Sequence, residues 1–207
     1  MVKLGGSLAK SERLTAVLEL VANARTPIVV VPGGGAFADA VRRAQADYGF
    51  SDASAHRMAL LAMHQTGLML AALQPRLKPV ETLAGLKRTA AGGRIPVWLP
   101  LKLVERDGRI AADWSTTSDG LAARLAQRLG RAPVVLVKSC RVSKRTSVAA
   151  LAREGVVDPT FAAIVDRARL PWHVLGAGDE EELAALLKVA VRAKAPARKR
   201  ARKAGRR

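Results

Sequence analysis

The sequence predicts an α/β protein in which helices cover both faces of a central, mainly parallel β-sheet, giving a three-layer α/β/α sandwich. Short apolar, β-branched runs alternate with segments of helical periodicity along most of the 207 residues. Glycine-rich loops separate the first two predicted strands from the helices that follow them. The residues are 49% hydrophobic but only 3% aromatic, so the predicted core consists of Leu, Val and Ala side chains.

The first strand–loop–helix unit spans residues 1–24. Residues 1–4 predict a short strand, Gly5, Gly6 and Ser7 a loop, and residues 11–24 a helix. Lys3 lies two residues before Gly5, where its ammonium group could reach a phosphate held by the loop amides. Because so few residues precede this strand, a start further upstream stays open.

The second unit repeats this order. Residues 28–31 form a β-branched run that Pro32 ends, and Gly33, Gly34 and Gly35 lead into a helix. Residues without a Cβ let main-chain N–H groups approach an anion, and the following helix adds its positive dipole end. A tight turn with nothing bound explains one glycine cluster equally well. Two such loops, however, face one another at the carboxyl edge of a parallel sheet, where α/β proteins bind ligands.

A dinucleotide-binding interpretation of the second loop fails on its context. Gly33, Gly35 and Ala38 fit the looser pattern G-x-G-x-x-A, but that pattern needs a strand ending in an acidic residue about 20 residues later. Residues 53–73 instead predict one long apolar helix, capped by Ser51 or Asp52.

Two histidines lie on that long helix. His56 and His64 are eight residues apart, whereas a metal-binding pair on a helix is usually three or four apart, so we predict no metal site. His56, near the start of the helix and the glycine edge of the sheet, is the better candidate for touching a ligand.

The middle of the chain predicts a looser region, a strand and a capped helix. Residues 75–93 contain prolines and glycines, residues 95–101 predict a strand, and Asp107-Gly108 is typical of a hairpin turn.

The helix that follows is capped by Thr116, Thr117 or Ser118 and ends at Gly130. Asp119 lies in its first turn, where a favourable interaction with the helix dipole explains the residue without any function.

The last third continues the alternation. Residues 133–138 predict a buried strand that ends in Lys138, and a lysine in that position usually meets an anion or an acid. Asp158 caps a helix that extends to about residue 168, and residues 171–175 predict a short strand. Asp179 and Glu182 predict a capping box at the last helix.

Charge divides the chain into two parts. The formal net charge is +18, and nine of these charges lie in residues 192–207, which contain no acid, leaving +9 for the rest. Anionic ligands suit both parts. We predict one domain over residues 1–193 and a disordered basic tail over 194–207 that serves solubility. Nucleic-acid binding by the tail is the less favoured alternative, because no aromatic residues interrupt it.

Cysteine usage and hydropathy indicate the cellular compartment in which we expect the protein. Cys140 is the single cysteine, which excludes an internal disulfide and fits a reducing environment. No leader-like stretch and no apolar run of membrane-spanning length is visible. These observations predict a cytoplasmic protein with no membrane partner.

Three motifs together resemble those of the amino acid kinase superfamily, which includes acetylglutamate, aspartate and uridylate kinases. They are residues 3–7 (KLGGS), the loop at 32–35 (PGGG) and residues 117–122 (TSDGLA), and they cover most of the chain. Residues 33–42 (GGGAFADAVR), 55–59 (AHRMA) and 114–119 further resemble the furan-phosphate kinases of methanofuran biosynthesis. This resemblance implies ATP-dependent conversion of [5-(aminomethyl)furan-3-yl]methyl phosphate into its diphosphate, within one-carbon cofactor biosynthesis.

The resemblance also implies roles for individual residues. The expected ATP-binding residues are Lys3, Gly5, Gly6, Ser7, Thr117, Ser118 and Lys138. The expected acceptor-binding residues are Gly33, Gly34, Gly35, Arg42 and His56. Lys3, Asp119 and Lys138 would be catalytic, with Asp119 orienting the basic groups and Lys138 neutralising the phosphoryl group in transfer. Mg²⁺ bound to ATP and a homo-oligomer are further expectations from the resemblance.

The sequence departs from the family pattern at one place. Residues 139–142 (SCRV) replace the aspartate-glycine pair that relatives carry after this strand, and residues 143–157 lack their later Gly-Met and Lys motif. Two alternatives therefore stay open. One is another small-molecule kinase of this fold, such as a uridylate kinase-like enzyme, and the other is a non-catalytic nucleotide-binding or oxyanion-binding protein.

Overall fold

A single parallel sheet forms the centre of the protein. The computed structural model describes residues 1–143 and 146–189, and within these ranges six strands pair in the order β3-β4-β2-β1-β5-β6, all parallel. The strands are β1 (Val2–Leu4), β2 (Val30–Pro32), β3 (Leu77–Val80), β4 (Ile95–Trp98), β5 (Val134–Val137) and β6 (Trp172–Leu175). The predicted mainly parallel sheet is confirmed.

The central strand β1 brings three loops to one edge of the sheet. Lys3 of β1 is in register with Val31 of β2 on one side and with Leu136 of β5 on the other. Because all three strands run in the same direction, the residues that follow them meet at the same carboxyl edge. The chain leaves β1 toward β2 and later returns to its other side as β5, which makes this edge a topological switch point.

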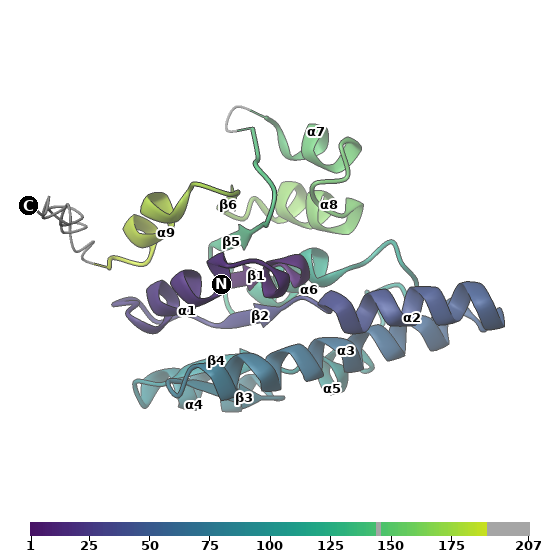
Figure 1. Cartoon of the computed structure of the whole chain (residues 1–207), viewed down its shortest axis with the longest axis horizontal. Coiled ribbons are helices and arrows are strands. Elements are labelled where there is room, and N and C mark those ends of the chain that lie inside the picture. Colours follow the sequence, from purple (N-terminus) through teal and green to yellow (C-terminus); the bar gives the residue numbers. More distant parts are fainter. Residues whose placement is uncertain (144–145, 190–207) are drawn as a thin grey trace, which may run out of the picture.

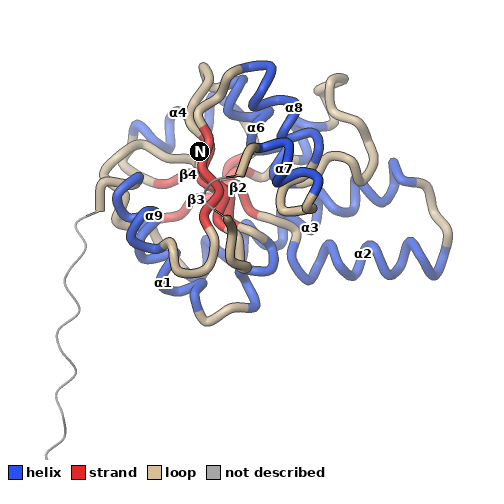
Figure 2. Tube along the Cα trace, turned by 90° about the horizontal axis from the view of Figure 1, so that it is seen from above, coloured by secondary structure: helices blue, strands red, loops and turns tan. Residues whose placement is uncertain are grey.

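Helices cover both faces of the sheet, as Figures 1 and 2 show. One apolar core contains Val30, Val135 and Val137 together with side chains of α1 (Arg13–Ala22) and α9 (Glu180–Leu186). The other core contains Val31 and Leu136 with side chains of α4 (Leu83–Ala91), α6 (Ser118–Arg128), α7 (Val148–Arg153) and α8 (Pro159–Ala168). Adjacent strand residues thus point to opposite faces, and the predicted three-layer arrangement is confirmed.

Two long helices extend past the sheet. Figures 1 and 2 both show α2 (Gly35–Tyr48) and α3 (Asp52–Leu73) lying side by side as an antiparallel pair. Gly49 joins them with a φ of +68°, and the hydroxyl of Ser51 caps α3 by accepting from the N–H of Ser54. The N-terminal half of α3 packs on one core through Leu60 and Met63, and its C-terminal half on the other through Leu70.

The two glycine loops contact each other through their backbones. The first leaves β1 and enters a short 3₁₀ segment, η1 (Gly6–Lys10), and the second leads from β2 directly into α2. A Cβ on Gly6 would lie 2.2 Å from the backbone nitrogen of Gly35, and one on Gly33 would lie 2.4 Å from the nitrogen of Gly6. Gly35 itself has a φ of +55°. These positions need glycine because no side chain fits between the loops.

The region predicted to be loose contains regular structure. Residues 75–93 hold β3 and α4, with Leu77 and Leu86 buried and Thr82 capping the helix. β3 is an edge strand, which is where a strand tolerates a proline such as Pro79. The prediction was wrong because proline and glycine dominated the local pattern.

Three local predictions were also wrong. The residues at Asp107-Gly108 form no hairpin in the described chain. The Asp107 carboxylate instead accepts two hydrogen bonds from Arg124, at 2.7 and 3.0 Å. The strand predicted over 95–101 ends at Trp98, and α5 (Leu101–Val104) follows Pro100. The Asp179 side chain makes no capping bond to α9, because it accepts from the N–H of Gly176 at 2.8 Å.

The predicted basic tail lies outside the described residues. Among the helices that are described, none is long and apolar enough to cross a membrane.

Gly6→Ala tests the contact between the loops. We expect the free energy of unfolding to fall by about 2–4 kcal/mol, because the new methyl group must displace the backbone of Gly35. Urea unfolding followed by circular dichroism measures the change. Gly108→Ala is the matched control, since a Cβ there meets nothing within 4 Å. Equal effects of the two substitutions would contradict the packing described above.

Candidate active site

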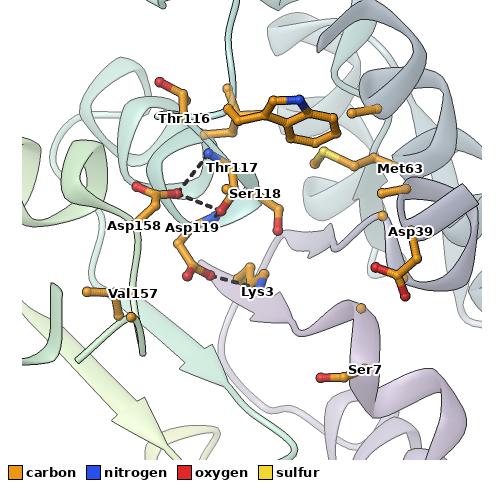
Figure 3. Close-up of a pocket in the computed structure, with 18 of the residues that line it drawn as sticks. Lys3, Ser7, Asp39, Met63, Thr116, Thr117, Ser118, Asp119, Val157 and Asp158 are labelled. Carbon is orange, nitrogen blue, oxygen red and sulfur yellow. Dashed lines mark hydrogen bonds and ion pairs between the residues drawn. The ribbon is translucent and has the colours of Figure 1, made fainter. Parts of the chain in front are cut away.

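A cavity of about 490 Å³ opens at the carboxyl edge of the sheet, beside the two glycine loops (Figure 3). It is lined by most of the residues that the sequence assigned to a site, which are Lys3, Gly6, Ser7, Gly34, Gly35, Arg42, His56, Thr117, Ser118, Asp119 and Lys138. Gly5 and Gly33 are not among the lining residues. Gly5 instead packs against the backbone of Val137, and Gly33 packs against the backbone of Gly6.

Three charged side chains meet at the centre of this cavity. The Nζ of Lys3 lies 2.8 Å from Oδ1 of Asp119, and the Nζ of Lys138 lies 2.5 Å from Oδ2 of the same carboxylate. Lys3 comes from β1, Lys138 from the end of β5 and Asp119 from the first turn of α6. The side chains of Lys3 and Asp119 are 6% and 4% exposed. The cluster therefore carries a net positive charge in a place with little solvent to screen it.

Burial and mutual attraction shape the acidity of the cluster. Burial raises the pKa of Asp119, but the charges of Lys3 and Lys138 outweigh this and leave it below its ordinary value. Burial lowers the pKa of Lys138, and repulsion from Lys3 lowers it further, while Asp119 opposes both. Asp119 thus stays ionised and holds two cations near each other. A bound phosphate would stabilise both ammonium groups.

Asp158 connects the N-termini of two helices beside the site. The sequence predicts it only as the cap of one helix. Its Oδ2 accepts from the N–H and the hydroxyl of Thr117 and from the N–H of Gly120, at 2.9, 2.7 and 2.9 Å. Its Oδ1 accepts from the N–H of Phe161 at 2.6 Å. One carboxylate therefore caps both α6 and α8. Figure 3 shows its contacts with Thr117. Burial raises the pKa of this group.

Arg13 fixes the loop ends on the β5 side. Its guanidinium donates to the carbonyl of Lys138 at 3.1 Å, to the carbonyl of Gly176 at 2.9 Å and to the carboxylate of Glu180 at 2.5 Å. These bonds join α1, the ends of β5 and β6, and α9. Local sequence patterns do not indicate this role, because all three acceptors lie more than 120 residues from Arg13 along the chain.

Near the start of α3, His56 is 93% buried and lines the cavity. Its Nδ1 lies 3.2 Å from the carbonyl oxygen of Asp113. Since a carbonyl only accepts, Nδ1 carries the proton and donates it. Within the described residues, Nε2 is buried without a hydrogen-bond partner. His64, in contrast, accepts from the N–H of Leu101 with its Nε2 and is a structural residue.

Arg42 packs on an aromatic side chain that also lines the cavity. Its guanidinium carbon lies 4.3 Å from the ring centroid of Trp114, and the indole N–H donates to Gln45 at 2.6 Å. Arg42 also donates to Asp39 at 3.4 Å and is half exposed. The structure thus places Arg42 at the cavity, stacked on Trp114.

The residues that follow Lys138 are those at which the sequence departs from the motif that the resemblance implies. The hydroxyls of Ser7 and Ser139 lie 2.7 Å apart, so the residue that replaces the family aspartate contacts the first glycine loop. Ala152 and residues 155–159 add a mostly apolar wall to the cavity. Cys140 is exposed as a free thiol.

The described residues contain no group of three or more His, Cys, Asp or Glu side chains that could hold a metal ion. Both oxygens of Asp119 face lysine ammonium groups. These residues therefore suit an anion better than a cation bound by protein ligands alone.

The arrangement is suited to holding two phosphate groups close together. Backbone amides of two loops meet at one edge, and α2 directs its N-terminus to the same place. Lys3 and Lys138 supply charge that offsets the repulsion between two anions. Such a site needs no general base, because positioning and charge compensation dominate phosphoryl transfer.

Asp119→Asn tests the ion cluster through stability. The variant leaves two buried ammonium groups without their counter-charge, so we expect a loss of about 3–5 kcal/mol in the free energy of unfolding at pH 7. The ordinary pKa of this carboxyl is 3.8 and folding lowers it. Its contribution is therefore complete above pH 3.8 and is lost as the pH falls through the folded-state pKa.

Urea unfolding of both proteins at pH 7 and near pH 3 measures this dependence. The difference in the free energy of unfolding between the natural protein and Asp119→Asn should be smaller near pH 3 than at pH 7. Asp47→Asn, an exposed position on α2, is the control and should change stability by less than about 0.5 kcal/mol at either pH. A loss for Asp119→Asn that is unchanged at the lower pH would contradict the assignment.

Comparison with known proteins agrees with this fold. The chain is 30% identical over 138 residues to the [5-(aminomethyl)furan-3-yl]methyl phosphate kinase of Methanocaldococcus jannaschii, a match that covers 66% of this chain and 63% of that relative. The matched region therefore spans less than two thirds of the relative's length.

Two solved structures share the fold. The uridylate kinase of Archaeoglobus fulgidus superposes with a TM-score of 0.66 at 18% identity, covering 90% of this chain and 95% of that one. The isopentenyl phosphate kinase of T. acidophilum gives 0.55 at 13%, covering 89% and 94%. The model of the amino acid kinase family matches residues 1–140, which include both glycine loops, Asp119 and Lys138. The chain belongs to the amino acid kinase family.

Proposed function

We propose that the protein transfers the γ-phosphoryl group of ATP to the phosphate of a small phosphomonoester, and that the acceptor is [5-(aminomethyl)furan-3-yl]methyl phosphate. The observation that carries this proposal is the buried Lys3–Asp119–Lys138 cluster beside two touching glycine loops. The acceptor is taken from the relative in Methanocaldococcus jannaschii, whose name states that substrate. The product would serve the biosynthesis of a methanofuran-type one-carbon cofactor.

In the proposed reaction one P–O bond forms and one P–O bond breaks. An oxygen of the acceptor phosphate attacks the γ-phosphorus of ATP, and the bond between that phosphorus and the β,γ-bridging oxygen breaks. The products are the acceptor diphosphate and ADP. Two anions must approach in line, so their repulsion is a main obstacle that the site has to offset.

The site residues take the following roles in this proposal. Lys3 and the amides of the Gly5–Ser7 loop bind the β- and γ-phosphates, and Thr117 and Ser118 add contacts at the N-terminus of α6. Lys138 stabilises the transferred group. Asp119 is a positioning residue, since both of its oxygens are held by the two lysines.

The acceptor occupies the side of the cavity formed by α2 and α3. The Gly33–Gly35 loop and Arg42 bind its phosphate, and Nε2 of His56 provides a further polar contact. Leu60, Met63 and Trp114 line the same cavity and give a small ring an apolar surface.

Mg²⁺ accompanies ATP in this proposal. Because the described residues offer no cluster of protein ligands, phosphate oxygens and water would supply its coordination. A cytoplasmic location and a role of residues 194–207 outside catalysis remain predictions.

A uridylate kinase-like activity is the second candidate, because the Archaeoglobus fulgidus uridylate kinase shares the fold over 90% of the chain. UMP is also a phosphomonoester, so the same two loops could bind it. A non-catalytic nucleotide-binding role is the third. Comparing acceptors in one assay separates all three.

Lys138→Ala tests the catalytic proposal. ADP formation from ATP should require the furan phosphate and should not occur with UMP. The variant should remain folded by circular dichroism, because Lys3 still pairs with Asp119, while kcat falls about 10²–10³-fold. Lys102→Ala, an exposed lysine on α5, is the control and should retain full activity. Unchanged turnover in Lys138→Ala would refute the role of this lysine, and turnover with UMP instead would favour the second candidate.

We also propose that the protein forms a homo-oligomer through the α2–α3 pair. Met58, Leu61 and Leu68 lie on one face of α3 and are 39%, 43% and 53% exposed. Phe37 of α2 is 40% exposed on the same helical pair. A second copy of this chain would cover these apolar side chains. The α2–α3 pair that carries them extends beyond the sheet (Figures 1 and 2).

Leu68→Glu tests this surface. Light scattering coupled to size-exclusion chromatography should show a dimer or larger assembly for the natural protein and a monomer for the variant, because the carboxylate would be buried in the interface. Ala84→Glu places the same charge on an exposed position of α4 and should leave the mass unchanged. A monomeric natural protein would contradict the proposal.

A further inference from the structure

We propose that Trp114 is a positioning residue, which holds the guanidinium of Arg42 in place to bind the phosphate of the acceptor. This inference rests on the proposed function, because it explains how one residue of the proposed acceptor site is kept in position. It assigns to Trp114, so far only an apolar part of the cavity wall, an action on a charged neighbour.

Arg42 lies on the face of α2 that lines the cavity. The lining residues of this helix are at helical spacing and are Gly35, Ala38, Asp39 and Arg42. Side chains of a helix lean toward its N-terminus. A long side chain at this position can therefore reach back toward the Gly33–Gly35 loop, where the acceptor phosphate is proposed to bind.

A long and exposed cation binds a phosphate well only if its neighbours restrain it. The Arg42 side chain is 50% exposed, and a flexible side chain loses rotamer entropy when a ligand fixes it. A hydrogen bond to Asp39, at 3.4 Å, restrains Arg42 from its own helix. Trp114 restrains it from a different part of the chain, the segment between α5 and α6.

Trp114 contacts Arg42 through the face of the guanidinium. The guanidinium carbon lies 4.3 Å from the ring centroid of Trp114, a distance at which a cation and an aromatic face attract each other. The N–H donors of arginine lie in the plane of the guanidinium, so a partner on the face does not occupy them. Stacking thus restricts the side chain and leaves its edge to the oxygens of a phosphate.

Hydrogen bonds fix the Trp114 ring in turn. Its indole N–H donates to Oε1 of Gln45 at 2.6 Å. The amide nitrogen of Gln45 donates to the carboxylate of Asp52 at 2.7 Å and to the carbonyl of Phe50 at 3.2 Å. Gln45 is therefore held at the turn between α2 and α3, and the indole ring cannot rotate without losing its bond to Gln45.

The backbone on each side of Trp114 is attached to a different helix. Before it, the carbonyl of Asp113 accepts from Nδ1 of His56 on α3 at 3.2 Å. After it, the carbonyl of Ser115 accepts from the hydroxyl of Thr160 on α8 at 3.1 Å. The position of the ring is thus set by contacts that do not involve Arg42, which is what a residue that orients Arg42 requires.

A double-mutant cycle tests this role. Trp114→Leu removes the aromatic face, Trp114→Phe keeps a smaller one, and Arg42→Ala removes the group on which Trp114 acts. Trp114→Leu is also combined with Arg42→Ala. Tyr48→Leu is the matched control, because it removes an aromatic side chain of α2 that is 83% exposed. The readouts are kcat and the KM values for the furan phosphate and for ATP.

Trp114→Leu should raise the KM for the furan phosphate about two- to thirtyfold, the range expected for a cation–π contact. It should leave kcat and the KM for ATP unchanged, because the lost interaction concerns binding of the acceptor alone. Trp114→Phe should raise the acceptor KM less, since a smaller aromatic face remains. In the Arg42→Ala background, Trp114→Leu should have almost no further effect. Tyr48→Leu should behave as the natural protein does.

Three results would overturn the positioning role. One is an unchanged acceptor KM in Trp114→Leu. Another is an effect of Trp114→Leu that persists in full in the Arg42→Ala background, because Trp114 would then act on the acceptor or on the fold directly. The third is an equal rise in the KM for ATP. The proposed function would stand in each case, since the natural protein would still phosphorylate the furan phosphate.

Failure of the proposed function gives a different result. If the natural protein phosphorylates UMP alone, the furan acceptor is wrong, and the same cycle measured with UMP decides the role of Trp114. If it phosphorylates neither compound, the proposed function fails and the positioning role fails with it.

Discussion

The structure depends on one buried carboxylate that holds two ammonium groups. Asp119 contacts Lys3 from the central strand and Lys138 from its neighbour, and it supplies the counter-charge for both buried ammonium groups. The Lys3–Asp119–Lys138 cluster places net positive charge at the carboxyl edge of the sheet, where the two glycine loops contact each other. In the function that we propose, a bound anion would offset part of the cost of burying these charges, which would link the stability of the fold to ligand binding.

The parallel sheet explains why residues so distant in the sequence meet there. β1 lies between β2 and β5 in register, so each strand delivers its following residue to the same edge. Asp158 and Arg13 then fix the surrounding elements, the first by capping α6 and α8 and the second by joining the ends of β5 and β6. The hydrogen bonds of Asp158 and Arg13 that hold these elements together thus also shape the site for which we propose a function.

Much of this arrangement could be predicted from the sequence, because its strongest signals are local. The glycine loops, the caps at Ser51, Thr117 and Asp158 and the lysine that follows β5 all mark their elements within a few residues. Other features depend on partners far along the chain. Nothing near Arg13 indicates that it contacts the carbonyl of Lys138, and nothing near Asp107 shows that Arg124 replaces a hairpin there. Pro79 argued against a strand in the sequence. A proline is tolerated there because β3 lies at the edge of the sheet, and the sheet order is not visible in the local sequence.

The central claim is that both glycine loops and the Lys3–Asp119–Lys138 cluster hold two phosphate groups at one site. A crystal structure with a non-hydrolysable ATP analogue and the furan phosphate tests it most directly. We expect the γ-phosphate at the Gly5–Ser7 loop beside both lysines, with the acceptor phosphate at the Gly33–Gly35 loop and in line with it. Electron density that places either phosphate group away from these loops, or the two groups in separate cavities, would contradict the account.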